Sequence, residues 1–91
     1  MNQRIKPISN IDDLLKQAQS LQSDPSLQSV LKPYPVPQHW SAYGVLLRYK
    51  RKHQLYQDAK ASSKIFWREA IARIEPAVKA IAQYLEEQHH D

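Results

Sequence analysis

The chain has 91 residues, which suits one domain with a modest core and is too short for two. It contains no cysteine, which excludes disulfides, thiolate metal sites and cysteine catalysis, and which suits a reducing compartment. Gly44 is the only glycine, which argues against the glycine-rich phosphate loops of familiar nucleotide-binding enzymes. No apolar run is long enough to cross a membrane, and residues 1–10 lack an apolar signal core, so we expect a cytoplasmic protein.

The net charge of +4 is distributed unevenly along the chain. Residues 48–79 contain nine lysines or arginines and three acidic residues, whereas the rest of the chain contains four basic and six acidic residues. This asymmetry creates a positive field around one part of the protein. The charge therefore favours a polyanion or an acidic protein surface as the partner.

Two helices are predicted in the first third of the chain. The first spans residues 10–22, with Asn10 as the N-cap and one apolar stripe, formed by Ile11, Leu14, Ala18 and Leu21. The second spans residues 25–32, where Asp24 can cap the helix and Pro33 ends it. Both predicted helices are too short to form a core alone, so they are expected to pack against the rest of the chain.

A proline-rich connector is predicted at residues 33–38, the sequence PYPVPQ. Each proline disfavours the helical conformation for the residue before it, so we expect an extended segment close to polyproline II. We interpret the segment as a stiff connector. A strand that docks into an aromatic groove is the weaker alternative.

A long helix is predicted over residues 39–60. Its apolar positions follow spacings of four and three residues, at Ala42, Leu46, Tyr49, His53 and Tyr56. A second apolar patch at its start consists of Trp40, Tyr43 and Leu47. This end of the helix is therefore expected to lie between two neighbouring elements, and the patch is a candidate partner interface.

The last predicted helix spans residues 63–88, with Ser62 or Ser63 as its N-cap. Its apolar stripe is the most regular in the chain, formed by Trp67, Ile71, Ile74, Val78, Ile81 and Leu85 and widened by Phe66, Ala70 and Ala82. Pro76 interrupts the stripe without changing its phase, which favours a kink over a break.

Together these patterns predict a single all-α domain over residues 1–91, a small helical bundle. Its two long helices are expected to pair as an antiparallel hairpin, with the two short N-terminal helices and the proline-rich connector laid across them. We list Ile74 and Val78 with the patch at Trp40, Tyr43 and Leu47 as candidate contacts with a partner or with a second copy of the chain.

No group of residues has the spacing of a catalytic or metal site. His39 and His53 are interpreted as structural, and Asp12 and Asp13 point to different sides of one helix, so no nucleophile–base or carboxylate pair is formed. Ligand spacing is also absent at the last three residues, His89, His90 and Asp91. We therefore expect no catalysis, no cofactor, no metal and no small-molecule substrate.

The candidate nucleic-acid interface begins with the sequence RYKRKH at residues 48–53. Cationic side chains interleaved with aromatic ones are typical of proteins that follow a nucleic-acid backbone. On a helical wheel, however, Arg51 points away from the apolar seam, Arg48 and Lys52 point to one flank and Lys50 to the other. We therefore add the cations near the predicted turn, so that the candidate residues are Arg48, Lys50, Arg51, Lys52, Lys60, Lys64 and Arg68.

No residues match a family motif, and two functions are therefore carried forward. The first is a non-catalytic module that binds the phosphate backbone without reading sequence, as a small subunit of a larger nucleoprotein complex. By analogy of size, charge and fold class only, the small helical subunits of RNA-guided CRISPR effector complexes illustrate this role. The second is a protein–protein adaptor or a self-associating helical hairpin. We expect no membrane role, because the last apolar stripe is needed for the core.

Overall fold

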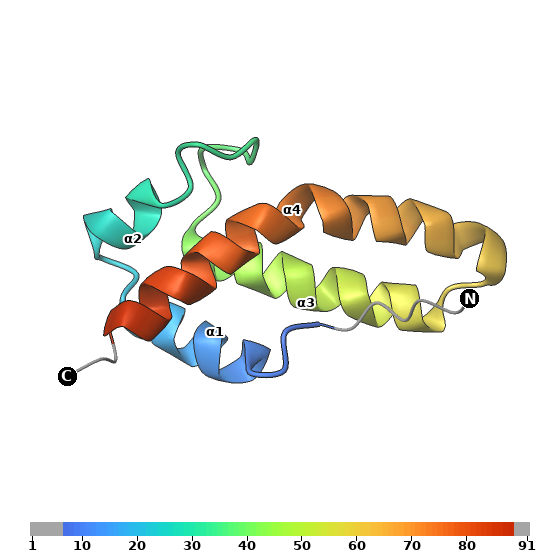
Figure 1. The fold of residues 1–91 in the computed structure, drawn as a ribbon, viewed down its shortest axis with the longest axis horizontal. Coiled ribbons are helices and arrows are strands. Elements are labelled where there is room, and N and C mark those ends of the chain that lie inside the picture. Colours follow the sequence, from blue (N-terminus) through green and yellow to red (C-terminus); the bar gives the residue numbers. More distant parts are fainter. Residues whose placement is uncertain (1–6, 89–91) are drawn as a thin grey trace.

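The computed structural model describes residues 7–88, which contain four α-helices and no β-strand. The helices are α1 (Ile11–Ser20), α2 (Pro25–Ser29), α3 (Ala42–Asp58) and α4 (Ala61–Gln88). α3 and α4 make the most extensive contact between helices, and α1 packs against both. Figure 1 shows the two long helices side by side, with their connection at the end away from α2. The predicted all-α fold is confirmed.

The start of α3 is set by Ser41. Its hydroxyl accepts a hydrogen bond from the backbone N–H of Gly44 at 3.0 Å, which satisfies a donor of the first helical turn. Just before Ser41, the backbone N–H of Trp40 donates a hydrogen bond to the carbonyl of Pro37 at 3.0 Å. Residues 37–40 therefore form a turn that precedes the helix. The helix therefore begins three residues later than the predicted residue 39.

The connection between α3 and α4 consists of Ala59 and Lys60. The carbonyl of Lys60 accepts hydrogen bonds from the N–H groups of Ser63 and Lys64, at 2.8 and 3.0 Å. Lys60 thus stands at the N-cap position, and Ser63 lies inside the first turn of α4. The predicted capping by Ser62 or Ser63 is wrong, because an extended Ala59 (φ −74°, ψ 148°) lets the chain reverse over only two residues.

The connector at residues 33–38 contains turns, contrary to the extended conformation expected for it. The N–H of Tyr34 donates to the carbonyl of Leu31 at 3.0 Å, and the N–H of Val36 donates to the carbonyl of Tyr34 at 2.8 Å. The second bond closes a three-residue turn around Pro35, whose fixed φ suits the centre of an inverse γ-turn. Restriction by proline acts on single residues, so it does not keep the whole segment extended.

The core is formed by α1, α3 and α4 together with Leu27 of α2 and Leu31 just after it. In the three larger helices, the buried positions follow the predicted stripes with three additions and one exception. The additions, which widen the apolar faces, are Leu15, Val45 and Ala77. α3 contacts both α1 and α4, which explains why Val45 is buried beside Leu46. The exception is Phe66, which was predicted to widen the stripe of α4 and is 63% exposed.

Pro76 lies inside α4, which continues through it to Gln88. Proline lacks the N–H of an interior helical bond and its ring crowds the preceding turn, and both effects bend a helix. Figure 1 shows α4 changing direction in its middle. Pro76 lies near the middle of the helix, which spans Ala61–Gln88. Residues on both sides of Pro76, Ile74 and Val78, remain buried, so the apolar stripe keeps its phase.

Asp24 connects α2 to α4 through its carboxylate. One oxygen accepts from the N–H of Ser26 at 2.9 Å and caps α2, and the other accepts from the hydroxyl of Tyr84 at 2.7 Å. Both hydrogen bonds favour the ionised carboxylate and so lower the pKa of Asp24 below its usual value. The bond from Tyr84 makes the larger contribution, and the bond from Ser26 the next.

Substitution Tyr84→Phe is expected to raise the pKa of Asp24 towards its ordinary value of 3.8. Because the folded-state pKa is lowered, the stabilisation is present above the unfolded pKa and is lost as the pH falls through the folded pKa. The stability difference between the wild type and the variant should therefore shrink on acidification. NMR titration of the Asp24 carboxyl measures the shift directly. An unchanged pKa would contradict this assignment.

Candidate nucleic-acid interface

Lys50 is directed from α3 towards α1. Its ammonium group forms an ion pair with the Asp12 carboxylate, with the Nζ and Oδ1 atoms 2.6 Å apart. Both side chains are partly exposed, so the pair is expected to contribute less than about 1 kcal/mol to stability. It nevertheless neutralises part of the charge of Lys50, which is therefore a weaker phosphate ligand than its neighbours.

Arg48 lies beside the start of α3, where its guanidinium carbon is 4.1 Å from the centroid of the Trp40 ring. Trp40 packs against the core, so this cation–π contact holds the arginine in one region of the surface. Arg48 is exposed and therefore remains able to contact a phosphate.

Lys64 supports the connection between α3 and α4. Its ammonium group donates a hydrogen bond to the backbone carbonyl of Tyr56 at 2.8 Å. It also lies 4.5 Å from the centroid of the Tyr56 ring. This carbonyl is one of the last in α3, where unsatisfied acceptors and the helix dipole favour a positive charge. We assign Lys64 a structural role in addition to its positive charge.

The seven predicted cations do not form one cluster. Arg48 precedes the end of α3 by ten residues, or about 15 Å along the helix. One group therefore lies along α3 and comprises Arg48, Arg51 and Lys52. A second lies at residues 56–68, which we call the tip, and comprises Lys60, Lys64 and Arg68. Lys50 stands apart because it pairs with α1.

Two apolar side chains at the tip are exposed, which the sequence pattern did not predict. Ile65 is 66% exposed and was assigned no role from the sequence, and Phe66, which was expected to widen the apolar stripe, is 63% exposed. A signal was present, since Ile65, Phe66 and Trp67 are consecutive in a helix and neighbouring positions differ by about 100°. Three such residues cannot all face one partner helix.

The predicted partner-interface residues divide into exposed and buried ones. Leu47 is 44% exposed, while Trp40 and Tyr43 are half-buried against the core. Ile74 and Val78 are buried in the core of the single chain. A partner could reach the last two only if α4 separated from its neighbours.

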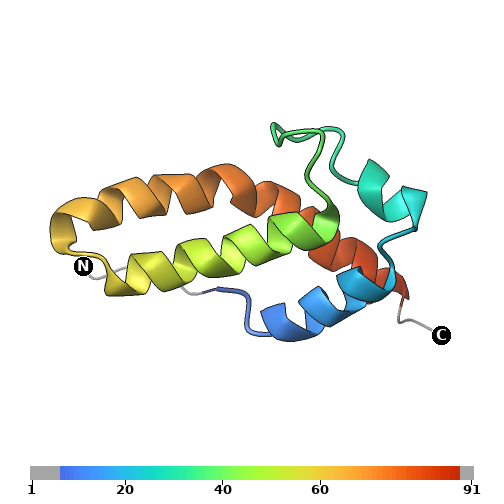
Figure 2. The same ribbon diagram turned by 180° about the vertical axis from the view of Figure 1, so that it is seen from behind.

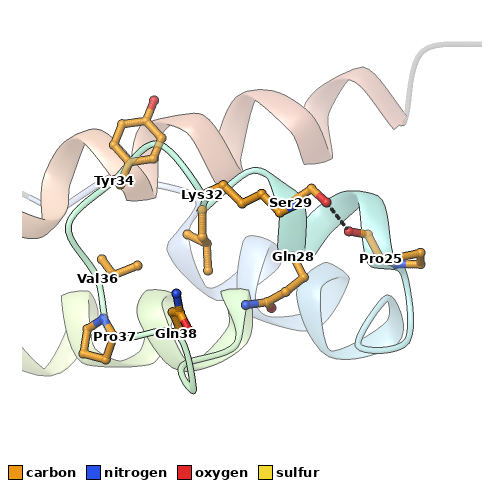
Figure 3. Close-up of a pocket in the computed structure, with 9 residues that line it drawn as sticks. Pro25, Gln28, Ser29, Lys32, Tyr34, Val36, Pro37 and Gln38 are labelled. Atoms are coloured by element: carbon orange, nitrogen blue, oxygen red, sulfur yellow. Dashed lines mark hydrogen bonds between the residues drawn. The ribbon is translucent and has the colours of Figure 1, made fainter.

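A half-open pocket of about 540 Å³ lies between α2 and the connector. Figure 3 shows its lining side chains, which come from α2 on one side and from the connector on the other. The lining is mainly apolar, with Leu31, Tyr34 and Val36 contributing, and Lys32 is its charged member. Tyr34 and Val36 also pack against the core, so the connector is a structural wall of the pocket.

The histidines within residues 7–88 differ in their surroundings. His39 is exposed, with its ring centroid 6.3 Å from that of Trp40. His53 is buried against Tyr49, and neither of its ring nitrogens has a hydrogen-bond partner among the described residues. In the same range, no three His, Asp or Glu side chains are grouped to hold a metal ion. His89, His90 and Asp91 lie outside the described residues.

No family model matches the chain, and neither a curated protein nor a solved structure matches it. None of the helices within residues 7–88 is long and apolar enough to cross a membrane. A function is therefore inferred from the charge, exposure and packing described above.

Proposed function

We propose that this chain is a non-catalytic helical module that binds the phosphate backbone of nucleic acid without reading its sequence. In a cell it would act as a small subunit of a larger nucleoprotein complex. The observation that supports the proposal is the separation of charge between elements. Nine basic and three acidic residues fall between positions 48 and 79, which span most of α3, the connection and the first two thirds of α4.

The arrangement of the exposed cations favours phosphate contact over base readout. Arg48, Arg51 and Lys60 are exposed on different parts of α3 and its connection to α4. Long cationic side chains at such intervals can neutralise phosphates along a strand, and phosphate contacts carry no direct sequence information. In this proposal α3 and α4 act as an antiparallel hairpin, a rigid support for these cations, with α1 bracing it through Lys50 and Asp12.

The salt dependence of binding tests the proposal. Four phosphate contacts, by Arg48, Arg51, Lys52 and Lys60, predict that log Kobs falls with log salt concentration with a slope of about −3 to −4. The double charge reversal Arg51→Glu and Lys60→Glu is expected to reduce the magnitude of the slope by about 2. Fluorescence anisotropy of labelled oligonucleotides over a salt series measures both slopes.

The matched control is the double charge reversal Lys16→Glu and Lys32→Glu. Both lysines are exposed, lie outside residues 48–79 and change the net charge by the same amount. This variant should keep a slope nearer that of the wild type. If the slope fell by the same amount in both double variants, net charge alone would account for binding. A wild type that binds no oligonucleotide at low salt would refute the proposed function.

Protein docking is a second candidate, favoured by the exposure of Leu47, Ile65 and Phe66. Large apolar side chains at the surface are common at protein interfaces when they gather into patches. In this candidate the cations keep the surface soluble or face an acidic partner. The salt series separates the two candidates, because an adaptor without a nucleic-acid role shows no oligonucleotide binding.

A further inference from the structure

The pocket between α2 and the connector is separate from the candidate nucleic-acid interface. Figures 1 and 2 show α2 at the opposite end of the long helices from the connection between α3 and α4. None of the seven candidate cations lines the pocket. Its volume of about 540 Å³ falls within the range of roughly 300–1,000 Å³ that is typical of small-molecule sites.

Hydrogen bonds and prolines fix both walls of the pocket. Gln28 of α2 donates from Nε2 to the carbonyl of Trp40 at 2.9 Å, which ties α2 to the chain just before α3. On the other wall, the turns of the connector keep Tyr34 and Val36 packed against the core. The prolines of the connector have fixed φ angles, which further restrict this wall. A site that is shaped before binding loses little conformational entropy when a ligand enters.

The lining of the pocket favours a ligand with a hydrocarbon body. Its carbon-rich side chains come from both walls and are those of Pro25, Leu31, Tyr34, Val36 and Pro37. Leu31 is only 4% exposed, so a ligand that reaches it is withdrawn from water. Each methylene buried in this way strengthens binding by about fourfold.

The charge of the pocket is carried by Lys32. This residue is exposed while the adjacent Leu31 is buried, so the positive charge stands at the open side of the pocket. Within residues 7–88 its ammonium group has no ion-pair or hydrogen-bond partner. No acidic residue is among the described residues that line the pocket, and the Asp24 carboxylate is already bonded to Ser26 and Tyr84. A single unpaired lysine complements one negative charge.

We propose that this pocket binds a small apolar carboxylate, with its hydrocarbon part against Leu31, Tyr34 and Val36 and its carboxylate paired with Lys32. This site goes beyond the proposed function and does not depend on it. The sequence pattern predicted no small-molecule site, because the pocket exists only where α2 and the connector meet in the fold.

The test is an NMR titration of isotope-labelled protein with octanoate, octanol and octylammonium, which share one chain and differ in charge. Octanoate is expected to shift the amide signals of Tyr34, Val36 and Gln38 in a saturable way. It should bind roughly 2- to 5-fold more tightly than octanol, the range for one partly exposed ion pair, and octylammonium should bind most weakly. Shortening octanoate to hexanoate should weaken binding by up to roughly 15-fold, since two buried methylenes are lost.

The variant Lys32→Met keeps an apolar side chain and removes the charge. It should abolish the preference for octanoate over octanol and leave the affinity for octanol unchanged. The matched control is Lys16→Met, which removes an exposed lysine of α1 that does not line the pocket and should retain the preference.

Equal binding of octanoate and octanol by the wild type, or a preference that survives in Lys32→Met, would overturn the inference. Signals that shift mainly at Ile65 and Phe66 would also overturn it, because the ligand would then only adhere to exposed apolar side chains. The salt series with oligonucleotides tests the proposed function separately, so either proposal can fail alone.

Discussion

Replacing Leu46 with alanine is expected to lower the free energy of unfolding by roughly 2–5 kcal/mol, the range for truncating a buried leucine. Leu46 has no exposed surface, and it lies on α3, the helix that contacts both α1 and α4. Truncation removes apolar contacts and leaves a cavity that helices packed on two sides cannot close. For a small domain with a total stability of roughly 5–15 kcal/mol, this loss is a large fraction.

The adjacent residue provides the control, because Leu47 is 44% exposed. Leu47→Ala makes the same chemical change one position along the same helix, and it should alter the stability by only about 0.5 kcal/mol. Urea denaturation followed by circular dichroism gives both values from the transition midpoints. Similar losses in the two variants would mean that Leu47 is covered in solution, as the adaptor or self-association candidate requires.

Replacing His53 with phenylalanine is expected to stabilise the protein at neutral pH by roughly 1 kcal/mol, because it removes a buried polar ring that lacks partners among the described residues. His53 packs edge-to-face with Tyr49, at 4.6 Å between ring centroids and 70° between planes. Phenylalanine can keep this contact, since aromatic pairs favour the same geometry.

The same substitution should also change the pH dependence of stability. Burial lowers the pKa of His53 below its ordinary value of 6.5, and the negative charge of Glu75 on α4 opposes part of that shift. The unfolded chain therefore binds the proton more readily, and the stability contributed by neutral His53 is complete above about pH 6.5 and declines as the pH falls below it. His53→Phe should remove this part of the decline.

Denaturation midpoints between pH 7.5 and 5.5 measure this difference. The control is His39→Phe, which replaces an exposed histidine outside the core and leaves His53 in place, so the decline should remain. The carboxyl of Asp24, whose pKa is lowered, titrates well below this window and does not interfere. An identical decline in the His53→Phe variant and in the wild type would show that the buried histidine is not its source.

The positions of the helices could be predicted because the periods of their apolar residues are local properties of the chain. The buried residues Leu14, Ala18, Leu46, Ile74 and Val78 all belong to predicted stripes. Their exact ends could not be predicted, because several residues near each end were able to cap. In the structure, the Ser41 hydroxyl caps the start of α3, and the carbonyl of Lys60 accepts the first hydrogen bonds of α4.

The candidate site was less accessible to prediction, because a count of cations does not say where each one points. Lys50 forms an ion pair with Asp12, which is 38 positions away in the sequence. Lys64 is held by Tyr56 across the connection, and Phe66 is exposed at a position that fits the edge of the stripe of α4. Each outcome depends on which helix lies alongside.

The sequence by itself determined the all-α class, the apolar seams and the concentration of positive charge in residues 48–79, because composition and periodicity are properties of the chain alone. The tertiary structure decided which cations remain exposed and which aromatic ring lies outside the core. The physical reason is that exposure and pairing depend on neighbours brought together by folding, such as Asp24 and Tyr84, which are 60 positions apart.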